Sequence, residues 1–558
     1  MLSLGYKNPL PRTLTLHPSF SFPPFSVHLL IPMSMNALAI YAIAAGGIFA
    51  GLFLIQTLSI LTNWTNLFSV LASRHLTLPF VVHRNRFWGL WSRASVLLHT
   101  SYVAVNVFLV LFRIESFTGA GHRAGELALV NLIFPLSATH LSFLADLLGI
   151  TWHTCRRIHR AAGWMATALL AFHIIVAVQA QHFNFRLANI SQGAASLGVL
   201  ALFSIPWFRR WSYEIFLRGH QILAGLFVYG TWRHLPTKSS SPKLYLWIAL
   251  GLLGLTSCLQ LVTLLYQNGL FVGRGAPRAI ISFTIRKSKE NILTTTAAQI
   301  RILLPWPVKV EAGQYINLWI PLASLWSWTQ THPFTVTSWS QGRQDTMELL
   351  IQPHRGLSVE LIRHASVAAE SSVSFLALFT GPHGTSEDVS QYKSALLITS
   401  GFRVAAAIPY LKKMIYGYNT CTLQIRRLHL VWQVKSIDMT TAAQGLLNNL
   451  LEDDIIDEGY ILNISIYVEN GLAHNKTPFG KHERVCLYQG VPDYRSIISL
   501  EASGDQIERL PNIRDEQGRM LVMVSTADDL RDHIQEIVRG YLHQGVKLSE
   551  MEYQPNAG

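Results

Sequence analysis

Four histidines stand in two apolar segments with the same separation in each segment. His159 and His173 are fourteen positions apart, and His220 and His234 repeat that spacing. Fourteen residues of α-helix advance about 21 Å and return to within roughly 40° of the starting direction, so both members of a pair face one side at two depths. Ionisable groups inside apolar segments are costly and usually functional. Two such helices side by side predict two b-type haems with axial histidines, one near each face of a membrane.

Single histidines need a different interpretation. A lone histidine in a helical bundle is usually a polar group that is hydrogen-bonded within the bundle. Metal ligation is favoured here because four histidines share one repeated spacing. His99 and His140 also occur in apolar sequence but lack a partner at that spacing. We therefore interpret them as hydrogen-bonding groups inside the bundle.

The elements that position these residues belong to a long apolar half of the chain. The sequence has 558 residues, of which 50% are hydrophobic and 14% charged. Apolar runs crowd residues 37–267, whereas most of the Asp and Glu follow them, which predicts a membrane domain and then a soluble part. The net charge of +13 forms no basic stripe interleaved with aromatic residues, so nucleic acid is not an expected partner. The four cysteines show neither zinc-ligand spacing nor a disulfide framework.

Seven apolar segments are expected to span the membrane. They lie near residues 38–61, 94–113, 129–150, 159–180, 194–208, 214–235 and 244–267. The fifth is shorter than the about twenty residues of a usual span. Residues 1–36 are rich in Pro, Ser and Phe, lack the pattern of a signal peptide, and are expected to be a flexible extension.

Arginine placement orients these helices. If the last segment delivers the soluble part to the cytosol, an odd number of spans places the N-terminus outside. Arg is then more frequent in the cytosolic connections than in the outer ones, as the positive-inside rule requires. His159 and His220 would lie near the cytosolic face, and His173 and His234 near the outer face. We expect a multi-pass protein of the plasma membrane with a cytosolic C-terminal half.

The next segment, residues 275–390, changes to short alternating or β-branched runs such as AIISFTIRK and AAQIRILLPW. Several short strands separated by turn residues predict a small antiparallel β-barrel. It contains the tetrapeptides HPFT at 332–335 and GPHG at 381–384. On their own, such tetrapeptides are more often turns than sites.

The last segment, residues 391–558, alternates between strand and helix, beginning with SALLITS, AAAIPYLKKMIYGY and RLHLVWQV. This alternation predicts a Rossmann-like, doubly wound parallel sheet. The turn after its first strand, SGFRVA at 400–405, stands where nucleotide-binding folds place phosphates at a helix N-terminus. Trp432, within RLHLVWQV, is expected in the core rather than in a catalytic role.

With the paired histidines, HPFT and the strand-helix alternation in this order, the chain resembles fungal ferric-chelate reductases, relatives of the NADPH oxidases. In that family the histidine pairs bind two haems, HPFT lies against FAD and the last domain binds NADPH. The resemblance implies a membrane domain at 37–267 with two haem sites, an FAD-binding barrel at 275–390 and an NAD(P)H-binding α/β domain at 391–558. The implied FAD-binding residues are His332, Pro333, Phe334, Thr335 and Tyr553. The implied NADPH-binding residues are Gly401, Arg403, Gly490, Pro492 and Ser525.

The nucleotide-binding domain departs from the family pattern. Arg403 stands where relatives usually have a second Gly, and it either blocks close backbone approach or itself meets a phosphate. Val491 replaces the Arg of a Gly-Arg-Pro pattern, and Ser525-Thr526-Ala527 replaces a Cys-Gly-Pro or Ser-Gly-Pro pattern. Tyr553 is a candidate to stack on flavin in place of the frequent terminal aromatic residue. The choice between NADPH and NADH therefore stays open.

The resemblance implies that electrons pass from cytosolic NADPH through FAD and two haems to an acceptor outside. Both histidine pairs have equal spacing, as in metalloreductases, whereas the second pair of animal-type oxidases is typically one residue shorter. Fe(III) or Cu(II) chelates or siderophores are thus the expected acceptors. Two alternatives are an NADPH oxidase that makes superoxide and, from another class, a transporter-like bundle with a decayed reductase domain. The metal, the chelate and the oligomeric state are not fixed by the sequence.

Overall fold

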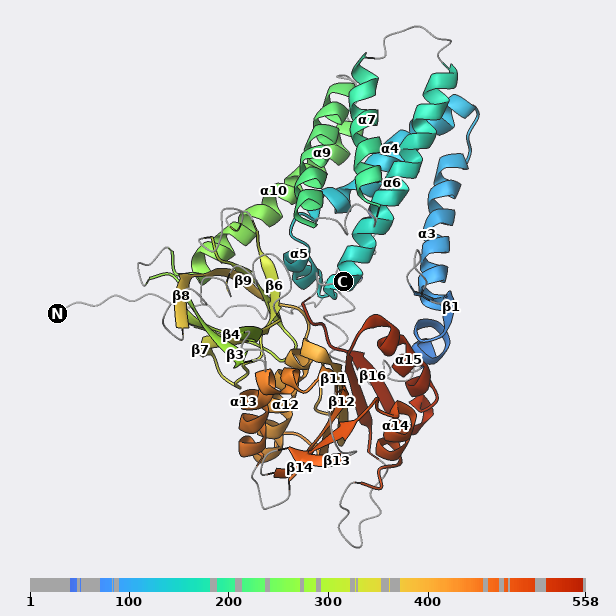
Figure 1. Ribbon diagram of the computed structural model, residues 1–558. Coiled ribbons are helices and arrows are strands. Elements are labelled where there is room, and N and C mark those ends of the chain that lie inside the picture. The colour runs from blue at the N-terminus through green and yellow to red at the C-terminus, as the bar shows by residue number, and fades with distance from the viewer. Residues whose placement is uncertain are drawn as a thin grey trace, which may run out of the picture.

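The structure is a computed structural model of the chain. It describes residues 41–47, 51, 71–82, 84, 90–180, 188–205, 213–235, 241–270, 275–287, 293–321, 327, 330–352, 361, 372–454, 460–470, 476–479, 482–506 and 518–554. The expected N-terminal extension, residues 1–36, and most of the first predicted span, 38–61, lie outside these ranges. The described residues form a helical part and a part built on β-sheets (Figure 1).

The helical part is made of long apolar helices. Their bounds are α3 (Arg93–Leu111), α4 (Phe117–Ser137), α5 (Leu141–Leu148), α6 (Trp152–Ala180), α7 (Ala188–Phe203), α9 (Tyr213–His234) and α10 (Ser241–Gln267). A π-helical turn, η1 (Ser73–Thr77), and the short strands β1 (Phe80–Val82) and β2 (Trp91–Ser92) precede them. Among the described helices α3, α6 and α10 are long and apolar enough to cross a membrane, and the bent pair of α4 and α5 makes a fourth candidate. The predicted total of seven spans stays a prediction.

The helices α4 and α6 pack closely because α4 has glycines at the contact. A Cβ at Gly121 would lie 2.6 Å from Val176 Cγ1, and one at Gly125 would lie 3.0 Å from His173 Nδ1. Ala124 and Leu127 of α4 are fully buried in the same contact. Small residues let helix backbones approach in a membrane, where packing rather than water exclusion holds helices together.

The third predicted span, 129–150, is wrong as a single helix. Its sequence is divided between α4, which begins at Phe117, and α5, and the chain bends by 102° between them. Pro135 lies in the last turn of α4, where its missing N–H removes a helical hydrogen bond, and the helix ends at Ser137. His140 lies at this corner, directly before α5.

The first sheet-rich segment contains two antiparallel sheets. One runs in the order β7-β4-β3-β8 and the other in the order β6-β5-β9. The strands are β3 (Arg278–Lys287), β4 (Leu293–Val308), β5 (Tyr315–Trp319), β6 (His332–Thr335), β7 (Gln344–Ile351), β8 (Ser372–Leu376) and β9 (Leu378–His383). Alternate side chains of both sheets, among them Ile300, Ile316 and Phe379, meet in one core. The strands that the structure describes stay in two sheets, so closure into a barrel is not confirmed.

The C-terminal part is built on a seven-stranded sheet in the order β13-β14-β12-β11-β10-β15-β16. Its strands are β10 (Ser394–Ser400), β11 (Arg427–Ser436), β12 (Leu462–Asn470), β13 (Lys476–Phe479), β14 (His482–Gln489), β15 (Met520–Ser525) and β16 (Val546–Glu550). All neighbours are parallel except β13 and β14. The predicted Rossmann-like sheet is therefore confirmed.

Helices cover both faces of this sheet (Figure 1). α12 (Val404–Asn419) and α13 (Asp438–Asp453) pack on one face, and α14 (Tyr494–Ser503) and α15 (Asp528–Arg539) on the other. Neighbouring residues of β10 point to opposite cores, since Leu397 packs with the first pair of helices and Leu396 with the second. The sequence SALLITS is apolar almost throughout because both faces of its strand are covered.

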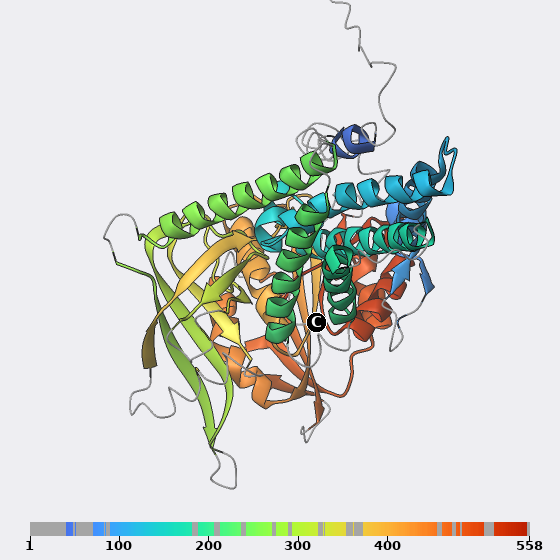
Figure 2. The same cartoon turned by 90° about the horizontal axis from the view of Figure 1, so that it is seen from above.

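The end of α10 joins the helical part to the two antiparallel sheets. Figure 2 shows α10 running from the other helices toward these strands. Directly after α10, Asn268 Nδ2 donates to the Phe379 carbonyl (2.8 Å), and the Phe379 N–H donates to Asn268 Oδ1 (3.0 Å). Asn268 is fully buried, so this pair of hydrogen bonds fixes β9 to the end of the helix.

Candidate functional site

The four histidines of the repeated spacing meet in two pairs. His159 and His173 lie on α6, and His220 and His234 lie on α9. The ring centres of His159 and His220 are 6.2 Å apart, and those of His173 and His234 are 6.3 Å apart. The structure therefore brings together the two pairs that the spacing predicts, at two levels of the same pair of helices.

These separations can be compared with a bis-imidazole metal site. Two metal–nitrogen bonds of about 2.0 Å, plus about 1.2 Å from each nitrogen to its ring centre, place the centres of two opposed imidazoles about 6.4 Å apart. Both observed separations agree with this value. Each pair thus fits one metal ion bound between two imidazole nitrogens, as in a haem with two axial histidines.

The free nitrogens of the imidazoles are consistent with ligation. His173 Nδ1 lies 2.8 Å from the Gly121 carbonyl oxygen, which can only accept, so Nδ1 carries the proton and Nε2 keeps its lone pair. Such a backbone partner commonly fixes the tautomer of a metal-ligating histidine. His159 Nδ1 and His220 Nδ1 are buried, and no hydrogen-bond partner for them is found among the described residues.

The HPFT motif forms strand β6. Phe334 packs into the core of the two sheets, while Thr335 Oγ1 accepts a hydrogen bond from the Gln554 backbone N–H (3.3 Å). The neighbouring Tyr553 has its hydroxyl buried and without a partner in the described part of the chain, and burial raises its pKa above the ordinary range. Thr335 and Tyr553, which are both predicted to contact FAD, therefore lie close together although they belong to distant segments of the sequence.

The nucleotide turn follows β10 as the sequence predicts. Gly401 has a φ of +57°, a left-handed conformation that glycine adopts without strain. Its carbonyl accepts a hydrogen bond of 2.7 Å from Trp432 Nε1, and Trp432 is 1% exposed. The expected core position of Trp432 is confirmed, but its role in holding this turn was not predicted.

The predicted nucleotide-binding residues lie at the carboxyl ends of the parallel strands, in two places. Gly401 and Arg403 follow β10, and Ser525 ends the neighbouring strand β15, with its buried Oγ lacking a partner among the described residues. Burial lowers the pKa of Arg403, although Asp528 opposes this effect. Gly490 and Pro492 follow β14, and β12 and β11 separate that strand from β10. The structure thus brings the first three together and places the last two farther along the same edge.

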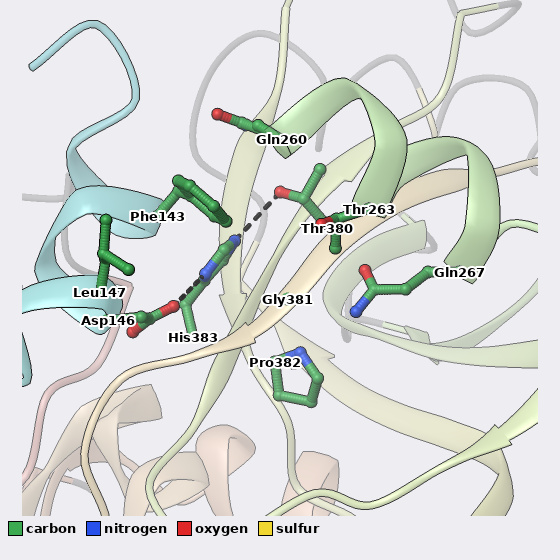
Figure 3. Close-up of a pocket in the computed structure, with 10 residues that line it drawn as sticks. All are labelled: Phe143, Asp146, Leu147, Gln260, Thr263, Gln267, Thr380, Gly381, Pro382 and His383. Atoms are coloured by element: carbon green, nitrogen blue, oxygen red, sulfur yellow. Dashed lines mark hydrogen bonds and ion pairs between the residues drawn. The ribbon is translucent and has the colours of Figure 1, made fainter. Parts of the chain in front are cut away.

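A contact between the helical part and β9 was missed by the sequence analysis. Asp146 of α5 accepts hydrogen bonds from His383 Nδ1 (2.6 Å) and from the Gly384 backbone N–H (2.9 Å), and the other ring nitrogen of His383 lies 3.1 Å from Thr380 Oγ1. A pocket of about 340 Å³ lies beside it, between α5, α10 and β9 (Figure 3). The GPHG motif was the only available signal, because Asp146 lies in an otherwise apolar run.

Two stretches of the chain match family models. Residues 124–231 match the model described as ferric reductase like transmembrane component, and residues 281–391 match an FAD-binding domain. The first range includes His159, His173 and His220 and ends just before His234. The second includes the HPFT strand.

Curated relatives and solved structures are similar to parts of this chain. Ferric/cupric reductase transmembrane component 2 of Saccharomyces cerevisiae is 24% identical over 374 residues, which cover 64% of this chain and 49% of the relative. NADPH oxidase 1 of Rattus norvegicus is 28% identical over 160 residues, which cover 28% of this chain and 27% of that protein. A flavohemoglobin structure from Malassezia yamatoensis aligns with 77% of this chain and 98% of its own at 12% identity and a TM-score of 0.37. The chain spans about half the length of the first curated relatives that it matches.

Proposed function

We propose that this chain, a relative of the ferric reductases through its membrane part and its FAD-binding domain, is a multi-pass membrane metalloreductase. Electrons would pass from cytosolic NADPH through FAD and two b-type haems to ferric or cupric chelates on the outer side. The observation that carries the proposal is the pairing of four histidines at ring separations of 6.2 and 6.3 Å on α6 and α9. If these histidines had only structural roles, there would be no reason for the two pairs to share the same ring separation.

Each proposed domain would bind a different cofactor. Residues 37–267 would hold the haems, residues 275–390 the FAD, and residues 391–558 the NADPH. When bound, a flavin takes two electrons as hydride from a nicotinamide, and haem iron takes electrons one at a time. The two histidine levels are fourteen residues apart on each helix, about 21 Å, so together they cover most of the hydrocarbon core of a bilayer, about 30 Å thick.

The side chains that this chain supplies have distinct tasks in the proposal. His159 and His220 would ligate at the inner level, and His173 and His234 at the outer level. The Gly121 carbonyl oxygen accepts a hydrogen bond from His173 Nδ1, which would leave Nε2 free to ligate a metal.

The reductase half would bind the two nucleotide cofactors. Strand β6 and Tyr553 would contact the flavin, since Thr335 and the C-terminal segment already meet at Gln554. Gly401, Arg403 and Ser525 would contact the nicotinamide nucleotide at the switch point between β10 and its neighbours, with Gly490 and Pro492 farther along the edge.

The acceptor would not enter the iron coordination sphere. With one histidine from each helix holding the iron, no position would be left for the acceptor, so reduction of a chelate would need only approach to the outer site. Electron transfer without binding to the iron is compatible with chelates of varied shape. It is less compatible with chemistry that requires binding of the acceptor to iron.

Intact cells that express the chain test the proposal. An impermeant Fe(III) chelate outside should be reduced at the expense of NADPH inside, and His173→Leu should abolish this flux, whereas His99→Gln should retain it. His99 also lies in an apolar helix, and among the described residues it contacts the Ser95 carbonyl through a hydrogen bond and the Trp91 ring, so it is the matched control. If superoxide accounts for all the NADPH consumed and iron does not compete, the protein is an oxidase. If the purified protein binds no FAD, the transporter-like alternative is favoured.

A further inference from the structure

A fifth histidine lies beside the outer pair. His122 is in the second turn of α4, and its ring centre is 6.2 Å from that of His173 in an edge-on arrangement. In the residues that the structure describes, no three His, Cys, Asp or Glu side chains converge to hold one metal ion. His122 is therefore not a third ligand of the site between His173 and His234, and its position needs another explanation.

A short bonded connection links His122 to the outer ligand. His173 Nδ1 donates to the Gly121 carbonyl oxygen at 2.8 Å, and the carbon of that carbonyl is bonded to the backbone nitrogen of His122. One hydrogen bond and a few covalent bonds thus separate the two imidazoles. A group bound at His122 would be well placed to exchange an electron with the outer site.

The surroundings of His122 favour a cation. Its side chain is exposed, and Glu126 follows four residues later on the same face of α4, within electrostatic range of it. The neighbouring Arg123 is turned away, because its guanidinium donates to the carbonyls of Phe112 and Leu109 at the end of α3. Among the described residues, the Glu126 carboxylate is therefore a charged side chain near His122 that can contribute to binding a cation, while the Arg123 guanidinium is held by these two carbonyls.

The geometry points to His122, supported by Glu126, as the site where the acceptor metal ion binds, with Cu(II) preferred over Fe(III) held by oxygen chelators. Imidazole and carboxylate are good ligands for Cu(II), whereas softer thiolate or thioether ligands select Cu(I). One electron from the outer site would convert Cu(II) to Cu(I), which this pair of ligands holds less well, so the product would leave. This inference deepens the proposed function and rests on it for the source of the electron.

Copper binding tests the site without any turnover. The purified full-length protein is dialysed against Cu(II) alone, and bound copper is counted for the wild type, His122→Asn and Glu126→Gln. We expect His122→Asn to weaken one Cu(II) site about tenfold or more, because one of two protein ligands is lost, and Glu126→Gln to weaken it less. His533→Asn, an exposed histidine on α15, is the matched control and should leave that site intact. Equal copper binding by the wild type and His122→Asn would overturn the inference.

Kinetics in intact cells test the link to reduction. His122→Asn should raise the KM for Cu(II) about tenfold with little change in kcat, whereas the control His533→Asn should leave both values within about twofold. An unchanged KM for Cu(II), or loss of one haem from His122→Asn, would overturn the assignment, the latter because His122 would then be an axial ligand. If the wild type reduces no metal but His122→Asn still loses a copper site, the proposed function fails and the copper site stands.

Discussion

Glu501, at the end of α14, shows how strongly a single carboxylate is held in this chain. It accepts hydrogen bonds from Arg427 Nε and Nη2 (2.7 Å each) and from His429 Nδ1 (2.8 Å). Burial alone would raise its pKa, but the hydrogen bonds and charges of these two partners outweigh burial and hold the pKa at about 2. The contact fixes α14 to strand β11 of the nucleotide sheet.

Replacing Glu501 with Gln should destabilise the nucleotide-binding domain. The change leaves the Arg427 charge buried without its partner, which costs on the order of 3 kcal/mol. Because the pKa is lowered, this stabilisation is present above pH 4.5 and is lost as the pH falls toward 2, so the two proteins should converge in acid. Thermal unfolding of the purified full chain at several pH values measures the difference.

A surface pair provides the control for this experiment. Arg301 and Glu348 are 3.1 Å apart with 62% and 31% of their side chains exposed, so Glu348→Gln should cost less than about 1 kcal/mol. If Glu501→Gln is no more destabilising than Glu348→Gln at neutral pH, the account of this contact is wrong.

At the residue scale, sequence patterns found groups whose spacing is regular and missed groups whose partners are distant. The four histidines were predicted because a fourteen-residue repeat is visible along the chain. The turn at Gly401 was predicted because it follows a strand that is apolar almost throughout, whereas its left-handed conformation is seen only in the structure. The contacts of Trp432 and Asp146 were not predicted, since their partners at Gly401 and His383 become neighbours only after folding.

At the element scale, the contact of Asp146 with His383 sets the position of the flavin-binding sheet relative to the inner histidines. Asp146 lies on α5, and α6 with His159 begins four residues after α5 ends. His383 ends β9, which pairs with β5, and β5 pairs with the HPFT strand β6. The contact therefore connects the helix that carries an inner ligand to the sheet proposed to bind FAD.

Replacing Asp146 with Ala should slow electron transfer from flavin to haem without slowing flavin reduction. Loss of hydrogen bonds to a charged group costs about 1.5–3 kcal/mol, so the docked arrangement should be populated roughly 10- to 100-fold less relative to undocked ones. Rapid mixing with NADPH, followed at flavin and haem wavelengths, separates the two steps. Asp529→Ala, at an exposed position on α15, is the control. Equal slowing of both steps in Asp146→Ala would indicate a general loss of structure and contradict this role.

Element boundaries were predicted well where strand-helix alternation alone sets them. They were predicted wrongly where a proline and a bend interrupt an apolar run. The strands and helices of residues 391–558 follow their alternating pattern closely. The segment 129–150 is mostly apolar, which predicts one span, but Pro135 and the corner at His140 divide it. Hydropathy cannot reveal the bend, because α4 and α5 on either side of it are both apolar.

At the scale of the whole molecule, the C-terminal segment returns to the helical part. Glu552 follows β16, and its carboxylate accepts a hydrogen bond from the backbone N–H of His153 at the start of α6. Burial and the neighbouring Glu550 raise the pKa of Glu552 to about 7, although this hydrogen bond and Arg156 oppose the shift. The segment that carries Tyr553 is thus attached to the helix that carries His159 and His173.

The folded protein should lose stability as the pH rises, because the buried Glu552 carboxyl group becomes charged, although the hydrogen bond from His153 favours the charged form. Because the pKa of Glu552 is raised, the stabilisation from its neutral form is complete below about pH 4.5 and is lost as the pH increases through about 7, a change on the order of 3 kcal/mol at most. Glu552→Gln should remove that dependence. The thermal midpoint of the purified protein between pH 5.5 and 8.5 measures it, and an identical pH slope in the two proteins would refute the role of Glu552.

The haem content of the purified protein tests the central claim most directly. The wild type, made in cells supplied with haem, should contain two b-type haems per chain with the low-spin spectrum of bis-histidine ligation. His173→Leu and His220→Leu should each lose one haem, from the outer and the inner level respectively. A wild type without haem, or single variants that keep both haems, would contradict the assignment of the paired histidines.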